Sequence, residues 1–142
     1  MDFLKTLTDY AGVDIEKMLK ASKEFSQKKM AIKACEELVE YQTVKNVDEL
    51  VLETVDNAIT LAHLMFSVGI YVVDEELFEK AEHNDLLLNL LWFYTKDKPL
   101  NYFYIANRLA MSLDILRHFD EEWVRSIFCQ QLKKLDKCLH WA

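Results

Sequence analysis

Five acidic residues in two short groups are the side chains of this sequence whose types and spacing suggest chemistry. Glu36, Glu37 and Glu40 form the first group, and Glu53 and Asp56 form the second after a gap of twelve residues. Residues three or four apart share a helix face, so each group makes a compact carboxylate patch. Such patches repel one another unless a cation lies between them. Mg²⁺ prefers oxygen ligands and activates bound water, so the residues predict phosphoryl or pyrophosphoryl hydrolysis.

The alternative interpretation is an ordinary solvated helix face. Glutamate is a good helix former, and acidic residues on exposed helix surfaces are common. Two details favour the metal site. Asp56 directly follows Val55, which belongs to a predicted core stripe, and both patches lie at similar distances from the connection between their helices. The choice between the two interpretations stays open at the level of sequence.

Long helices are the elements that would position these patches. The chain has 142 residues with only two glycines and one proline, which favours helices over turn-rich β folds. Apolar residues recur every three or four positions and predict one helix over 14–41 and a second over 48–68, ending near Gly69. Because the connection is short, these helices should be antiparallel neighbours, with their carboxylates facing each other across the groove.

Further helices are expected on both sides of this pair. One covers 3–10 and ends near Gly12, and a second covers 74–94, with Asp74 as its N-cap after a brief extended stretch at 71–73. A third covers 100–118, with Pro99 in its first turn, and a fourth runs from the Asp120 cap to Leu139. This pattern predicts one all-α domain over 1–142, an antiparallel bundle of about five to six helices.

Composition and charge exclude several classes of partner. The net charge of −7 disfavours nucleic acid, and the longest nearly apolar run, 58–73, is too short and polar to span a membrane. Three widely spaced cysteines, Cys35, Cys129 and Cys138, include no Cys-x-x-Cys pair, so a zinc-finger site is excluded. Their odd number and the lack of a signal peptide predict a reducing, cytoplasmic location.

The run Glu36-Glu37-Leu38-Val39-Glu40, followed after twelve residues by Glu53-Thr54-Val55-Asp56, resembles the EExxE…ExxD signature of the all-α nucleoside triphosphate pyrophosphohydrolases. That superfamily includes the MazG-like enzymes, the all-α dUTPases and the phage dCTPases. The resemblance covers roughly 22–85, a MazG-like core, and leaves 86–142 as a helical C-terminal extension. It implies Mg²⁺-dependent (or Mn²⁺-dependent) cleavage of a nucleoside triphosphate into a monophosphate and pyrophosphate, by a homodimer or homotetramer.

The resemblance also implies roles for individual residues. Glu36, Glu40, Glu53 and Asp56 would be direct metal ligands, and Glu37 would be either a further ligand or the base that activates water. Lys80 and Asn84, one helical turn apart, resemble a Lys and an Asn that contact phosphate and sugar in relatives. Lys80 as a solvated partner of Glu76 is the competing interpretation.

Two groups outside the signature remain open to more than one interpretation. His63, Thr60, Lys33 and Lys29 extend the polar wall of the groove, with His63 either supporting the metal site or bonded inside the bundle. The aromatic residues of the C-terminal half would stack on a base or fill the core: Trp92, Phe93, Tyr94, Tyr102, Phe103 and Tyr104.

Two other protein classes compete with the enzyme. A di-iron bundle is excluded because it needs Glu-x-x-His motifs on two helices, and the chain has none. A non-catalytic acidic adaptor, including a family-derived fold that has lost activity, stays open because the sequence identifies no substrate pocket.

Overall fold

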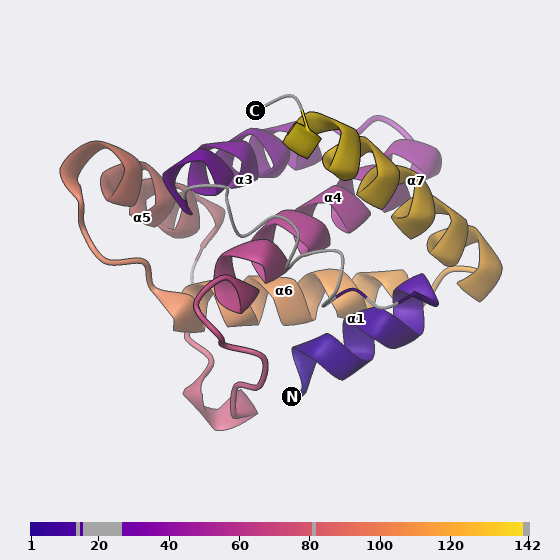
Figure 1. The fold of residues 1–142 in the computed structure, drawn as a ribbon, viewed down its shortest axis with the longest axis horizontal. Coiled ribbons are helices and arrows are strands. Elements are labelled where there is room, and N and C mark those ends of the chain that lie inside the picture. Colours follow the sequence, from indigo (N-terminus) through magenta and orange to yellow (C-terminus); the bar gives the residue numbers. More distant parts are fainter. Residues whose placement is uncertain (14, 16–26, 81, 141–142) are drawn as a thin grey trace.

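The computed structural model describes residues 1–13, 15, 27–80 and 82–140, with side chains described as far as Lys134. These residues form α-helices and one 3-10 turn without a strand, which confirms the all-α prediction (Figure 1). The helices are α1 (Phe3–Ala11), α3 (Gln27–Gln42), α4 (Val47–Phe66), α5 (His83–Lys96), α6 (Tyr102–Leu116) and α7 (Glu121–His140). Of the predicted helix over 14–41, residues 14 and 16–26 lie outside the described residues.

Helix α4 is the centre of the bundle. It packs against α3, α6 and α7, while α5 packs on α3 and α1 packs on α7. Every side chain from 57 to 66 on α4 is buried, including those of Asn57, Thr60 and His63. Burial on all sides leaves this half of α4 without a solvated face, so its polar side chains need partners inside the protein.

The short connection between α3 and α4 makes these helices antiparallel, as predicted. Only residues 43–46 separate them, and α4 runs back along α3 (Figure 1). Asn46 is the N-cap of α4, and its side chain accepts a hydrogen bond from the Glu49 N–H at 2.9 Å. The helix ends at Phe66, two residues before the predicted end. Gly69 follows at φ +80°, and the Ile70 N–H donates to the Met65 carbonyl.

The prediction of one continuous helix over 74–94 is wrong before His83, whereas 83–94 is helical as predicted. Asp74 does cap a turn, but that turn is a 3-10 helix of three residues, Glu75–Leu77. Phe78 is extended at ψ 129° and stacks on Phe3 with ring centroids 5.9 Å apart. The helix instead restarts at His83, where Glu82 and Asp85 form a capping box. Tertiary packing of an aromatic residue thus outweighs the local preference for a continuous helix.

The remaining helix boundaries are close to those predicted. Asp120 accepts a hydrogen bond from the Trp123 N–H at 3.0 Å and begins α7, as expected. Gly12 follows α1 at φ +69°, also as expected. Pro99 does not lie in the first turn of α6, because Asn101 is the N-cap of that helix and Pro99 precedes it.

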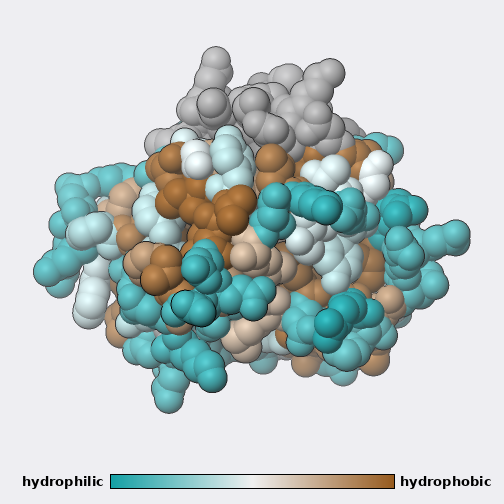
Figure 2. All heavy atoms as spheres, turned by 90° about the horizontal axis from the view of Figure 1, so that it is seen from below, coloured by the Kyte–Doolittle hydropathy of each residue, from teal (hydrophilic) through white to brown (hydrophobic). Residues whose placement is uncertain are grey.

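The surface is mixed in polarity. Figure 2 shows hydrophobic side chains gathered between hydrophilic ones on the lower face. A cavity of about 660 Å³ lined by Val72, Leu77, Phe103 and neighbouring residues opens at the protein surface. No helix among the described residues is long and apolar enough to cross a membrane.

Candidate metal centre

Two adjacent helix faces bring acidic residues of α3 and α4 together. On α3, Ala34, Glu37 and Leu38 belong to one buried stripe at helical spacing. On α4, Glu53 and Asp56 flank buried Val55. Asn57 on α4 sets the position of the two helices along each other, because its Nδ2 donates to the carbonyl of Glu37 on α3 at 3.3 Å and to that of Glu53 at 2.8 Å. The predicted meeting of the two patches across the groove is therefore present.

The closest group consists of Glu37, Glu40 and Glu53. One carboxylate oxygen from each lies within 4.8 Å of the others, a spacing at which a single metal ion can contact all three. Asp56 adjoins this trio through a hydrogen bond between its carboxyl and that of Glu37. These four residues, Glu37, Glu40, Glu53 and Asp56, are called the carboxylate cluster below. They form two pairs with i, i+3 spacing, one on each helix.

Glu37 is the deepest member of the carboxylate cluster. Its side chain is only 8 % exposed. Burial raises the pKa of Glu37 to about 8, and the negative charges of Asp56, Glu40 and Glu53 add to the rise, while Lys33 opposes it. At neutral pH, the carboxyl of Glu37 therefore holds a proton in the absence of a cation.

The pKa values of Glu53 and Asp56, the two members of the carboxylate cluster on α4, are also raised. Burial raises the pKa of Glu53 to about 7, with further contributions from Asp56 and Glu40. Burial also raises the pKa of Asp56, although hydrogen bonds from Gln131 and Glu37 and the charges of two lysines oppose this. Perturbed carboxyls that share a site are typical of functional centres.

The residues present fit a hard divalent cation. Glu37 Oε2 and Glu53 Oε2 are buried, and among the described residues no N–H or hydroxyl donor reaches either atom. A buried carboxylate oxygen needs a donor, a proton or a cation. Only oxygen ligands are offered, which suits Mg²⁺ or Mn²⁺ better than a metal that prefers nitrogen or sulfur ligands.

Glu36 was expected to be a direct ligand, and the structure places it elsewhere. Its side chain is exposed and is not among the carboxylates that the structure brings together. The reason is helical phase: successive residues are about 100° apart, and the stripe of Ala34, Glu37 and Leu38 faces the core. Glu37, rather than Glu36, therefore pairs with Glu40 in the cluster.

Lys80 and Asn84 do not have the relation that was predicted for them. Lys80 lies in the extended stretch before α5, so the two residues are not one helical turn apart, and both side chains are exposed. The same break removes the helical spacing between Lys80 and Glu76. Of the aromatic candidates, Trp92, Tyr94 and Phe103 are exposed, so the prediction that they fill the core is wrong for these three.

The polar stripe that continues Glu53 and Asp56 along α4 is buried. Thr60 Oγ1 donates to the carbonyl of Asp56 at 3.1 Å, and His63 is 2 % exposed. On α3, Lys33 is half-buried and acts on the pKa of both Glu37 and Asp56. Among the residues of the predicted polar wall, Lys33 is therefore one whose charge reaches the carboxylates.

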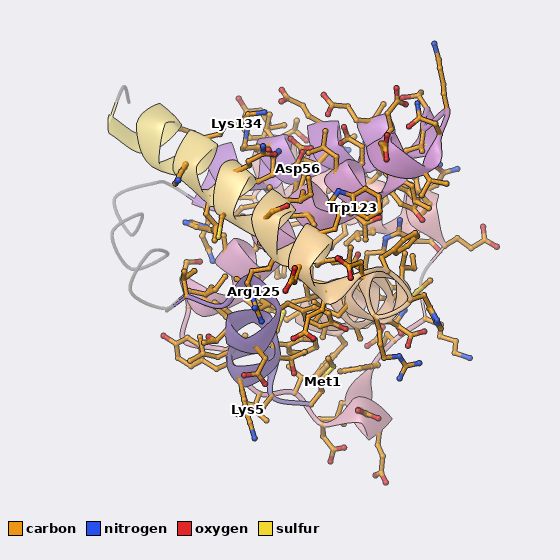
Figure 3. All side chains as sticks on the ribbon, turned by 90° about the vertical axis from the view of Figure 1, so that its right-hand side faces the viewer. Met1, Lys5, Asp56, Trp123, Arg125 and Lys134 are labelled. Carbon is orange, nitrogen blue, oxygen red and sulfur yellow. The ribbon has the colours of Figure 1, made fainter. Side chains whose placement is uncertain are left out.

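Helix α7 contributes residues that the sequence analysis missed. Gln131 Nε2 donates a hydrogen bond to Asp56 Oδ1, and the charge of Lys134 lowers the pKa of Asp56. In Figure 3, Asp56 and Lys134 both lie along the upper edge of α7. The signal in the sequence is weak, because Gln131 and Lys134 show only the i, i+3 spacing common to any helix face.

Comparisons of the chain with protein-family models, curated proteins and solved structures gave no match.

Proposed function

We propose that this protein is a divalent-metal-dependent nucleoside triphosphate pyrophosphohydrolase whose metal centre is the carboxylate cluster. One observation carries the proposal. Three carboxylate oxygens from two neighbouring helices lie within 4.8 Å of one another, although their mutual repulsion opposes that arrangement. The i, i+3 pairs on α3 and α4 also correspond to the acidic signature of the superfamily that the sequence resembles.

The residues of the cluster supply the ligands for this reaction. Glu37, Glu40, Glu53 and Asp56 would hold Mg²⁺ or Mn²⁺, which neutralises phosphate charge and lowers the pKa of water. The water oxygen forms a bond to the α-phosphorus, and the bond from that phosphorus to the bridging oxygen breaks. Pyrophosphate leaves with the electron pair of that bond, and the proton of water passes to an ionised carboxylate of the cluster.

The charge of the protein supports a substrate that arrives with a cation. A chain of net charge −7 repels a free polyanion, whereas a bound divalent ion gives the phosphates a local positive partner. The rival adaptor function does not account for the cluster. Glu37 is buried and its acidic neighbours raise the free-energy cost of its charge, and docking a partner does not require that cost.

Two finer parts of the proposal concern assembly and location. The resemblance implies a homodimer or homotetramer, which sedimentation velocity would test; a monomer at micromolar concentration would refute it. We place the protein in the reducing cytoplasm, where free thiols such as those of Cys35 and Cys129 persist. Recovery of the native protein from an oxidising compartment of its source cell would contradict that location.

A nucleotide panel with Mg²⁺ tests the enzyme directly. Pyrophosphate and phosphate release would be measured separately for common ribo- and deoxyribonucleoside triphosphates. We expect the wild type to release pyrophosphate and Glu53→Gln to release it at least about a hundredfold more slowly. Removing a residue that only supports a metal ligand already lowers metal affinity or activity by up to about a hundredfold, and Glu53 would be a ligand itself. Glu36→Gln is the matched control and should retain activity, because Glu36 is exposed outside the cluster.

The adaptor would be the better description if two results occurred together. These are no turnover of any nucleotide in the panel and no heat of Mn²⁺ or Mg²⁺ binding in calorimetry. Phosphate release without pyrophosphate would keep a metal-dependent hydrolase but would exclude the proposed position of cleavage.

A further inference from the structure

Helix α7 contacts the carboxylate cluster at Asp56. It packs on α4, and Gln131 from α7 donates to Asp56 Oδ1 (Figure 3). The other end of the Gln131 amide, Oε1, is buried and accepts no hydrogen bond among the described residues. A buried acceptor without a donor costs free energy, so the position of Gln131 is set by its contact with Asp56. The contact fixes the rotation of α7 at this point.

Fixing Gln131 also fixes Lys134, which lies three residues further along and on the same face of α7. The side chain of Lys134 lies along the same edge of α7 as Asp56, the hydrogen-bond partner of Gln131 (Figure 3). Among the described residues, however, it forms no ion pair with an acidic side chain. Its side chain is exposed, so its three donors can reach a ligand that binds over the cluster.

We infer that Lys134 is a substrate-binding residue that contacts the phosphates of the metal-bound nucleotide and thus brings α7 into the active site. This inference rests on the proposed function. Lys33 is half-buried on α3, one helical turn before Glu37. Two cations on different helices thus accompany the carboxylate cluster, and ammonium groups together with a bound metal ion can neutralise the charge of a phosphate chain.

The neighbouring residue provides a matched control. Lys133 is also exposed and carries the same charge, but it lies about 100° around α7 from Lys134. Loss of general positive charge would affect both positions equally. A specific contact with phosphate would affect only Lys134.

Calorimetry with two simple probes tests the inference without relying on turnover. Mn²⁺ would be titrated first, and inorganic pyrophosphate would then be titrated into the Mn²⁺-loaded protein. We expect Lys134→Met to weaken pyrophosphate binding by at least about tenfold, because a hydrogen bond to a charged group is lost. The Mn²⁺ affinity of that variant should not fall, and Lys133→Met should bind both probes like the wild type. Lys134→Arg should restore most of the pyrophosphate affinity.

Four results would overturn the inference. If Lys134→Met and Lys133→Met weaken pyrophosphate binding equally, the effect is general charge. If Lys134→Met also loses Mn²⁺ affinity, α7 supports the cluster and does not contact phosphate. If nucleotides are hydrolysed and Lys134→Met changes neither KM nor kcat, the inference fails while the proposed function stands. A wild-type protein that binds no Mn²⁺ would refute the metal centre itself, and this inference with it.

Discussion

Replacing Glu37 by glutamine should stabilise the metal-free protein at neutral pH. The carboxyl of Glu37 is 8 % exposed and its pKa is raised from 4.5 to about 8 by burial and by three neighbouring acids. In the unfolded chain the same carboxyl ionises freely at pH 7, so folding must take up a proton. Glutamine has nearly the same shape and carries no charge at any pH, which removes that requirement.

The magnitude follows from the pKa of Glu37. Between the unfolded pKa of 4.5 and the folded pKa of about 8, the folded state binds one proton more, so stability falls as pH rises. Each pH unit in that window costs about 1.4 kcal/mol, which gives about 3 kcal/mol at pH 7 as the upper value. For a domain of this size, such a change raises Tm by about 6–12 °C.

Urea unfolding of wild type and Glu37→Gln at several pH values is the assay. We expect the advantage of the variant to vanish near pH 4.5 and to grow towards pH 8, in the presence of a metal chelator. Glu36→Gln serves as the control, because its exposed side chain should change stability by less than about 0.5 kcal/mol. Equal stability of Glu37→Gln and Glu36→Gln across this range would refute the assigned burial and charge repulsion.

Two further predictions concern the same site. Affinity for Mn²⁺ should rise with pH between 6 and 8 and binding should release protons, because Glu37 and Glu53, with pKa values of about 8 and about 7, must ionise to become ligands. Calorimetry in two buffers of different ionisation enthalpy measures this, and a pH-independent affinity would contradict it. Asn57→Leu should destabilise the protein by about 1–2 kcal/mol, since it removes hydrogen bonds to carbonyls on both helices. Urea unfolding measures this, and the control Asn84→Leu, at an exposed position, should leave the free energy of unfolding nearly unchanged. If both substitutions lower the free energy of unfolding equally, the hydrogen bonds of Asn57 do not hold the two helices together.

The bundle and the pairing of α3 with α4 could be predicted because both depend on local patterns. Periodic apolar residues define α4, and the four-residue connection forces it back along α3. The break after Leu77 could not be predicted in this way. It depends on Phe78 stacking on Phe3, a contact between residues far apart in the sequence. Periodicity within a window of residues carries no information about such a partner.

The candidate site likewise has a part that could be predicted from the sequence and a part that could not. Spacing placed all five acidic residues in two patches, and the resemblance then ranked Glu36 ahead of Glu37 among the metal ligands. Both glutamates are compatible with a helical pair, since Glu36 is four residues and Glu37 three residues before Glu40. Only the buried stripe formed with Ala34 and Leu38 distinguishes them, and that stripe requires knowing which face of α3 meets α4.

The contribution of α7 changes where substrate specificity should be sought. The resemblance ends near residue 85, which would leave the C-terminal half as an appendage to a two-helix metal site. The hydrogen bond between Gln131 and Asp56 instead ties that half to the cluster. A metal centre recognises only the phosphates that all nucleotides share, so discrimination among nucleotides must come from side chains beyond it. Helix α7 is the element of the C-terminal half that contacts the cluster, and substitutions along it are the direct way to find that discrimination.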